Sequence, residues 1–201
     1  MHALEDAAFE KVSYSMQKAL RTFYIHDQRS TYAILDNDDK THLYAVSFSR
    51  RQGPQVTVAR PSGGKDLVGT ATYHTTKRLG FSASPKIILN FPTKSGSVSL
   101  NREGGLLSSD KRVLHSSVLG EVHFRTRVDS DPWKNGALMT SFIRCVDGEG
   151  RDLLVYRDES YHVDRMGCLE IDNALSQEGL DEVIVSAIAI LSVERINPSR
   201  I

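Results

Sequence analysis

The residues in this chain that could do chemistry are mainly basic, and they gather between positions 50 and 112. This stretch holds eleven lysines and arginines against three acidic residues, a local excess of eight positive charges (11 − 3), whereas the whole chain has 25 of each sign. Its basic residues are Arg50, Arg51, Arg60, Lys65, Lys77, Arg78, Lys86, Lys94, Arg102, Lys111 and Arg112. Such an asymmetry can mark a surface for an anionic partner, but solvated strand faces and turns would give the same counts.

Motifs for catalysis, nucleotide binding and metal binding are all incomplete. PSGGKD (61–66) lacks the upstream glycine and the following Ser or Thr of a phosphate loop. His115 stands beside Ser116 without a nucleophile elbow, the seven histidines show no metal-type spacing, and DNDD (36–39) lacks the rest of a calcium loop. Basic residues are not interleaved with aromatic ones in stripes, as nucleic-acid binding would need. We expect no enzyme activity, cofactor, metal or nucleic-acid partner, although a zinc site assembled across strands would leave no such trace.

The cysteines and the first residues of the chain indicate an intracellular protein. Cys145 and Cys168 have no metal-type spacing and are too few for a disulfide scaffold, so we expect both thiols to be free and buried. The first twelve residues contain no basic region followed by an apolar stretch, so we expect no secretory signal and a cytoplasmic location.

Residues 21–173 have the pattern of many short strands. In HLYAVSFSR (42–50), Tyr44 and Val46 alternate with small or polar residues, and EVHFRTRV (121–128) alternates apolar with charged residues. This period of two places one face inward and the other in water. Turn sequences such as RQGP, PSGG and DGEG separate roughly ten to twelve strands, a spacing typical of an antiparallel sandwich or barrel.

The residues before the strands carry the period of an amphipathic helix, predicted over 1–20. The apolar residues Leu4, Ala8, Val12, Met16 and Leu20 follow one another at intervals of four. We expect this helix to pack outside the sheet.

The stretch DEVIVSAIAILSVERI (181–196) is apolar on every side, with only two serines inside its central eleven residues. It is shorter than the about 20 apolar residues that a transmembrane helix needs. It is also longer than the usual strand of about five or six residues, and it contains no turn residue. A helix enclosed on all sides fits best, begun by Ser176 or Asp181 and ended before Asn197-Pro198.

The predicted strands and the predicted helix are compatible with one architecture, a barrel that encloses the helix. A barrel of about eight strands fills its own lumen with side chains, whereas a wider one needs a ligand, water or a plug. A helix of 16 residues is about 24 Å long, which suits the height of a barrel. The sequence therefore predicts a single, mainly β domain over residues 1–201, a closed antiparallel barrel around a buried hydrophobic C-terminal helix at 176–196.

Three stretches near the end of the chain carry a family resemblance. They are WKNGALMTSFIRCVDGEGRDLLVYRDE (133–159), CLEI (168–171) and the apolar helix that follows. With the many strands before them, from Phe23 onward, they resemble the Tubby C-terminal-like superfamily, which includes Tubby proteins, phospholipid scramblases and LURP-one-related proteins. The resemblance implies a twelve-stranded barrel closed around its C-terminal helix.

The resemblance also implies a function, because Tubby domains bind phosphoinositides through basic residues on the barrel exterior. Charge alone then selects Arg50, Arg51, Lys65, Lys77 and Arg78 as contacts for an anionic headgroup. We expect a non-enzymatic intracellular barrel that binds anionic phospholipid or phosphoinositide headgroups at a membrane surface, with no transmembrane segment. The alternative is a protein-interaction scaffold without a lipid ligand. The sequence does not show whether the five basic side chains share one face.

Overall fold

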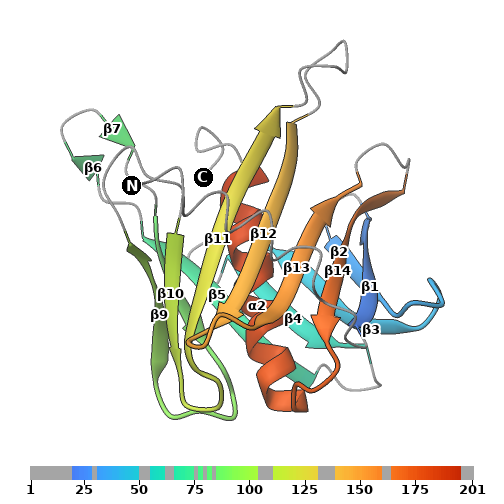
Figure 1. Ribbon diagram of the computed structural model, residues 1–201, viewed down its shortest axis with the longest axis horizontal. Helices are drawn as coiled ribbons and strands as arrows, with labels where there is room; N and C mark the ends of the chain where they lie inside the picture. Colours follow the sequence, from blue (N-terminus) through green and yellow to red (C-terminus); the bar gives the residue numbers. More distant parts are fainter. Residues whose placement is uncertain are drawn as a thin grey trace.

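The computed structural model describes a β-barrel, a short two-stranded ribbon and one helix (Figure 1). The described residues are 20–28, 31–49, 55–61, 66–74, 77–78, 81–82, 85–103, 111–130, 139–159 and 164–195. The predicted helix at 1–20 lies outside them apart from Leu20, which begins the first strand. Arg50, Arg51 and Lys65 also lie outside them.

Twelve of the described strands close into one antiparallel barrel, in the order β1-β14-β13-β12-β11-β10-β9-β8-β5-β4-β3-β2. The barrel strands are β1 (Leu20–Asp27), β2 (Thr31–Leu35), β3 (His42–Phe48), β4 (Val56–Arg60), β5 (Asp66–His74), β8 (Lys86–Asn90), β9 (Ser97–Glu103), β10 (Lys111–Ser116), β11 (Gly120–Ser130), β12 (Met139–Asp147), β13 (Asp152–Asp158) and β14 (Arg165–Asp172). β6 (Lys77–Arg78) and β7 (Phe81–Ser82) pair with each other outside the barrel. The helix α2 spans Gln177–Arg195. The predicted mainly β, closed barrel is therefore confirmed.

The burial of the strands follows the alternation seen in the sequence. In β3, Tyr44 and Val46 are buried while Ala45 and Ser47 are exposed. Alternate residues of β11 from Val122 to Thr126 are buried in the same way. These two strands thus turn one face toward the interior and the other toward solvent, as a period of two requires, whereas β5 and β14 contain runs of four buried residues.

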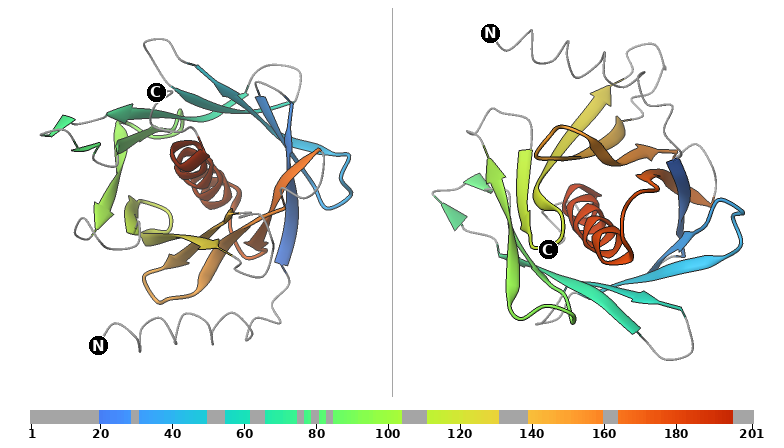
Figure 2. Two further views of the ribbon diagram at one scale, coloured as in Figure 1. Left: turned by 90° about the horizontal axis from the view of Figure 1, so that it is seen from above. Right: turned by 60° about the horizontal axis from the view of Figure 1, so that its bottom comes forward.

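The helix runs through the ring of strands, as both views in Figure 2 show. Every side chain from Glu182 to Ser192 is buried. Its N-cap is Ser176, whose hydroxyl oxygen accepts a hydrogen bond from the Gly179 N–H at 3.2 Å. The wall packs tightly on the helix at Gly69 of β5, where an added Cβ would lie 3.0 Å from Val185 Cγ2. The predicted central helix is confirmed, and the lumen is filled by the chain itself.

The two ends of the barrel can be told apart by the helix. α2 begins at the end where β8 passes into β9, because Lys94 of that connection pairs with Glu182; we call this the helix-entry end. Antiparallel pairing puts the β2–β3 and β4–β5 connections at the same end. The β3–β4 and β5–β8 connections lie at the opposite, helix-exit end. Figure 1 shows the entry end at the bottom and the exit end at the top.

Replacing Ile188 with Asp should prevent folding. The side chain is fully buried, and an unpaired buried carboxylate costs several kcal/mol or more, against a total stability of about 5–15 kcal/mol. We expect the variant to be insoluble, or to show no cooperative transition in thermal melts followed by circular dichroism.

The matched control is Val118→Asp, which makes a similar change at a side chain that is 39% exposed. Exposed substitutions usually change stability by about 0.5 kcal/mol or less. A soluble Ile188→Asp protein that melts cooperatively, like the control, would contradict the enclosed helix.

Candidate functional site

Of the five predicted headgroup contacts, Lys77 and Arg78 form β6, while Arg50, Arg51 and Lys65 lie outside the described residues. The strands that flank these positions in the sequence can be located. β3 and β4, which flank Arg50 and Arg51, meet at the helix-exit end, where Phe48 pairs with Val56. β5 and β8, which flank Lys77 and Arg78, meet at the same end, where His74 pairs with Lys86. β4 and β5, which flank Lys65, meet at the helix-entry end, where Arg60 pairs with Asp66.

Several other basic residues of the 50–112 stretch have structural partners. Lys111 pairs with Glu103 at 3.1 Å. Arg112 is buried, and its Nη1 donates to the Pro85 carbonyl oxygen at 3.1 Å. Lys86, at the start of β8, is exposed at the helix-exit end. The excess of positive charge is therefore partly used to hold the fold together, and only part of it faces solvent.

Lys94 and Glu182 form a buried ion pair between the wall and the helix. The exposed side-chain fractions are 12% for Lys94 and 2% for Glu182. Lys94 Nζ also donates to the Ser117 hydroxyl at 2.9 Å. A desolvated pair of this kind fixes the depth of the helix in the barrel, because removing one partner leaves the other charge buried.

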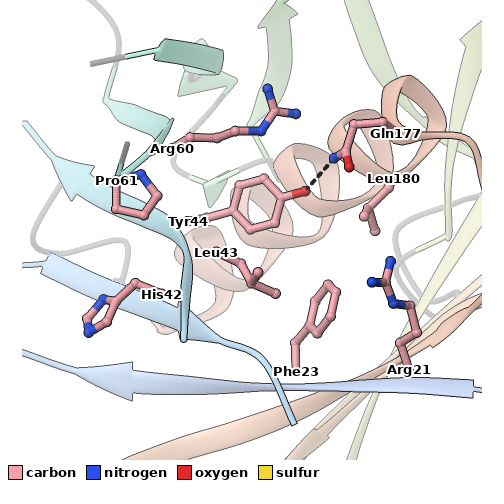
Figure 3. Close-up of a pocket in the computed structure, with 9 residues that line it drawn as sticks. All are labelled: Arg21, Phe23, His42, Leu43, Tyr44, Arg60, Pro61, Gln177 and Leu180. Atoms are coloured by element: carbon pink, nitrogen blue, oxygen red, sulfur yellow. Dashed lines mark hydrogen bonds between the residues drawn. The ribbon is translucent and has the colours of Figure 1, made fainter. Parts of the chain in front are cut away.

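A pocket of about 250 Å³ opens in the barrel wall beside the start of α2 (Figure 3). We call it the window pocket. It exists because β2 is only five residues long and its last paired residue, Leu35, lies opposite Tyr24 and His42. The first residues of β1 therefore have β14 on one side but no β2 residue on the other. The lining residues are Arg21, Phe23, His42, Leu43, Tyr44, Arg60, Pro61, Gln177 and Leu180.

Asp181 of the helix accepts hydrogen bonds from three residues that line the window pocket. Its carboxylate accepts hydrogen bonds from the Tyr44 hydroxyl at 2.9 Å and from Gln177 Nε2 at 3.0 Å. Arg60 Nη2 donates to the other oxygen at 2.5 Å. Burial, and then the nearby Asp181 charge, raises the pKa of Tyr44 above its ordinary value, so this hydroxyl stays a donor at neutral pH.

The mouth of the pocket carries a second arginine. Arg21 is exposed, and its guanidinium carbon lies 5.9 Å from the centre of the Phe23 ring. Within the described part of the chain, no carboxylate forms an ion pair with Arg21. Arg21 and Arg60, with Asp181 bonded to Arg60, leave the site with one net positive charge (2 − 1).

The β2–β3 turn beside the window is held to the barrel by Asp39. This residue has a positive φ of 56°, and its carboxylate accepts from His26 Nε2 at 2.7 Å and Arg165 Nη2 at 2.8 Å. Burial alone would raise the pKa of Asp39, but the hydrogen bonds from Arg165 and His26 hold it below its usual value. Arg165 also lies over the Tyr24 ring at 3.9 Å. These contacts fix the turn that borders the window.

A second pocket of about 240 Å³ lies on the outer wall over β12, β13 and β14. Two ion pairs occupy it, Arg144 with Asp152 and Arg157 with Glu170, the latter at 3.2 Å. With Asp172 also in its lining, this pocket has one net negative charge (2 − 3), so it favours an anion less than the window pocket does.

The two thiols are poor nucleophiles. Cys145 and Cys168 are free and buried, as predicted. Burial raises the pKa of Cys145 well above its ordinary value and that of Cys168 to about 12, so both are thiols at neutral pH. In the described stretches no three His, Cys, Asp or Glu side chains come together in a way that could hold a metal ion. None of the described helices has the length and apolar character to cross a membrane.

Comparisons with family models, with curated proteins and with solved structures found no match to this chain. The resemblance to the Tubby C-terminal-like superfamily therefore stays a prediction. The fold that it implied, a twelve-stranded barrel around a C-terminal helix, is the fold of this protein.

Sequence reasoning missed the window pocket. Arg21 and His42 lie outside the basic stretch of 50–112, and Asp181 was predicted only as a helix cap. No local pattern joins them, because Arg21, Arg60 and Asp181 meet only through barrel closure. The one available signal was the acidic start of an apolar helix, which needs cations nearby once it is buried.

Replacing Lys94 with Met should lower the free energy of unfolding by about 3–5 kcal/mol, because the buried Glu182 carboxylate loses its partner. Urea unfolding measures this loss. A double variant, Lys94→Met with Glu182→Met, should recover most of it, since replacing a buried pair by apolar groups is often neutral.

Lys111→Met is the control, because both members of the Lys111–Glu103 pair are about a third exposed or more, at 35% and 46%. Such a pair contributes about 0–1 kcal/mol. Equal losses in the Lys94 and Lys111 variants would mean that Lys94 is not a structural residue.

Proposed function

We propose that this protein is a non-enzymatic intracellular barrel that binds anionic phospholipid headgroups, phosphoinositides among them, at a membrane surface. Of the five predicted contacts, the proposal centres on Arg50, Arg51, Lys77 and Arg78, whose flanking strands end at the helix-exit end, whereas the strands that flank Lys65 end at the helix-entry end. The observation that carries the proposal is topological: the β3–β4 and β5–β8 connections, which hold all four residues, leave the barrel at the same end.

Exposed Lys86 supports this assignment, because it begins β8 where the second of these connections returns to the barrel. Lys and Arg near an anionic surface contribute about 1 kcal/mol each, so a group of four or five is enough for reversible binding. The binding surface must lie outside the lumen, since α2 fills the interior from Glu182 to Ser192.

The resemblance to the Tubby C-terminal-like superfamily agrees with this function and with a cytoplasmic, peripheral membrane location. The competing proposal is a protein-interaction scaffold with no lipid ligand. Pairing of a partner strand to the barrel has little support, because the closed twelve-stranded sheet has no free edge.

Changing Lys77 and Arg78 together to Glu should weaken binding to vesicles of phosphatidylcholine that contain a phosphoinositide. Loss of two favourable charges costs about 2 kcal/mol, which is roughly 30-fold in the dissociation constant. Vesicle flotation measures the bound fraction. The parent protein should bind at low salt and dissociate as salt rises, and it should not bind pure phosphatidylcholine vesicles.

The matched control changes Lys40 and Lys65 together to Glu, because it alters the net charge equally at the helix-entry end. Its binding should stay close to that of the parent. Equal losses in the two variants would remove the helix-exit end from the proposal. No binding by the parent would overturn the lipid function, and stoichiometric recovery of one protein in a pull-down would then favour the scaffold.

A further inference from the structure

The window pocket is a concave site at the helix-entry end, away from the proposed membrane contacts. Its mouth is set by the early end of β2, and the β2–β3 turn beside it is fixed by the Asp39 contacts with His26 and Arg165. The pocket is therefore preformed. Preformed concave sites with a few polar groups are the usual places for small ligands.

The charges of the pocket favour an anion. Arg60 is held in place by Asp181, which leaves Arg21 at the mouth as a cation without a carboxylate partner among the described residues. Arginine donates in a fork that matches the two oxygens of a carboxylate or phosphate. The single net positive charge suits a monoanion better than a polyanion, because Asp181 repels further negative charge from the inner side.

The remaining lining is largely apolar and the space is small. The apolar residues of the lining are Phe23, Leu43, Pro61 and Leu180, which Figure 3 shows together with Tyr44 and the two arginines. The volume of about 250 Å³ lies below the roughly 300–1,000 Å³ of pockets for drug-sized ligands. The site suits a ligand with an apolar body of about one ring and one anionic group.

We propose that the window pocket binds a small organic monoanion, with its charged group on Arg21 and Arg60 and its apolar body against Phe23, Leu43 and Leu180. Gln177 Nε2 already donates to the Tyr44 hydroxyl at 3.2 Å and to Asp181 at 3.0 Å, which leaves the Oε1 atom of Gln177 to accept a hydrogen bond from a donor of the ligand. The charged group is a carboxylate, which carries one charge and matches the guanidinium fork, whereas a phosphate monoester carries about −1.5 to −2 at pH 7.

Titration of the full chain with benzoate, followed by backbone amide shifts in NMR, tests this proposal. Benzoate should shift the amides of Leu43, Tyr44, Gln177 and Leu180 at concentrations up to about 10 mM, which covers a dissociation constant near 1 mM. Benzamide has the same shape without the charge and should bind at least about tenfold more weakly, since a hydrogen bond to a charged group contributes about 1.5–3 kcal/mol. Phenyl phosphate in place of benzoate tests the preference for a single charge and should bind more weakly, and acetate tests whether the apolar body is needed.

Arg21→Gln should weaken benzoate binding about tenfold or more and leave the melting temperature unchanged, because Arg21 is exposed. Lys86→Gln, at the other end of the barrel, should change neither quantity. The proposal is overturned if none of the anions shifts the pocket amides, if benzamide binds as tightly as benzoate, or if Arg21→Gln binds benzoate like the parent. The benzamide comparison needs no variant, so it holds whatever the stability of Arg21→Gln.

Discussion

The side chains of α2 from Glu182 to Ser192 are all buried, and the wall that buries them consists of strands that would otherwise surround an empty lumen. A twelve-stranded barrel is too wide to be filled by its own inward side chains, and a helix this apolar cannot face water. Neither part is stable alone. The close approach of Val185 to Gly69 and the hydrogen bond from the Tyr73 hydroxyl to the Ala189 carbonyl oxygen, at 2.9 Å, show how closely wall and helix fit. The helix follows all of the described strands in the chain, so complete packing of the barrel awaits the synthesis of the helix.

Apolar packing alone would let such a helix slide or rotate, because its burial is similar on every side. The charged residues at its start remove that freedom. Asp181 meets Arg60 and Tyr44, and Glu182 meets Lys94, so both acids have partners on the wall. Ion pairs that are desolvated contribute little net stability but penalise any arrangement that separates them. We infer that these pairs set the depth and rotation of the helix, and that the same interactions give the window pocket its fixed arginine.

Because the helix fills the lumen, a ligand has to bind at the surface of the molecule. The two ends of the barrel differ in the groups that they present to a ligand. The helix-exit end carries the connections with adjacent basic pairs, which suits an extended anionic surface. The helix-entry end has a small, partly apolar pocket with one net positive charge, which suits a discrete small anion. The short strand β2 creates this second possibility, because a longer β2 would continue the wall across the window.

The sequence by itself determined the fold class. Periods of two in stretches such as 42–50 specify strands with one buried face, and the length and uniform hydrophobicity of 181–196 exclude both a strand and a membrane span. Both patterns involve residues that are close together in the sequence, so they can be recognised in a single amino-acid sequence. Which charges converge was decided only by the tertiary structure. The strands that flank Lys65 and those that flank Lys77 and Arg78 end at opposite ends, because successive connections of an antiparallel barrel alternate between its ends. Arg21 and Arg60 line one pocket, and Arg60 bonds to Asp181, because the barrel closes around the helix. Contacts between residues so distant in sequence depend on register and closure, and no local pattern encodes them.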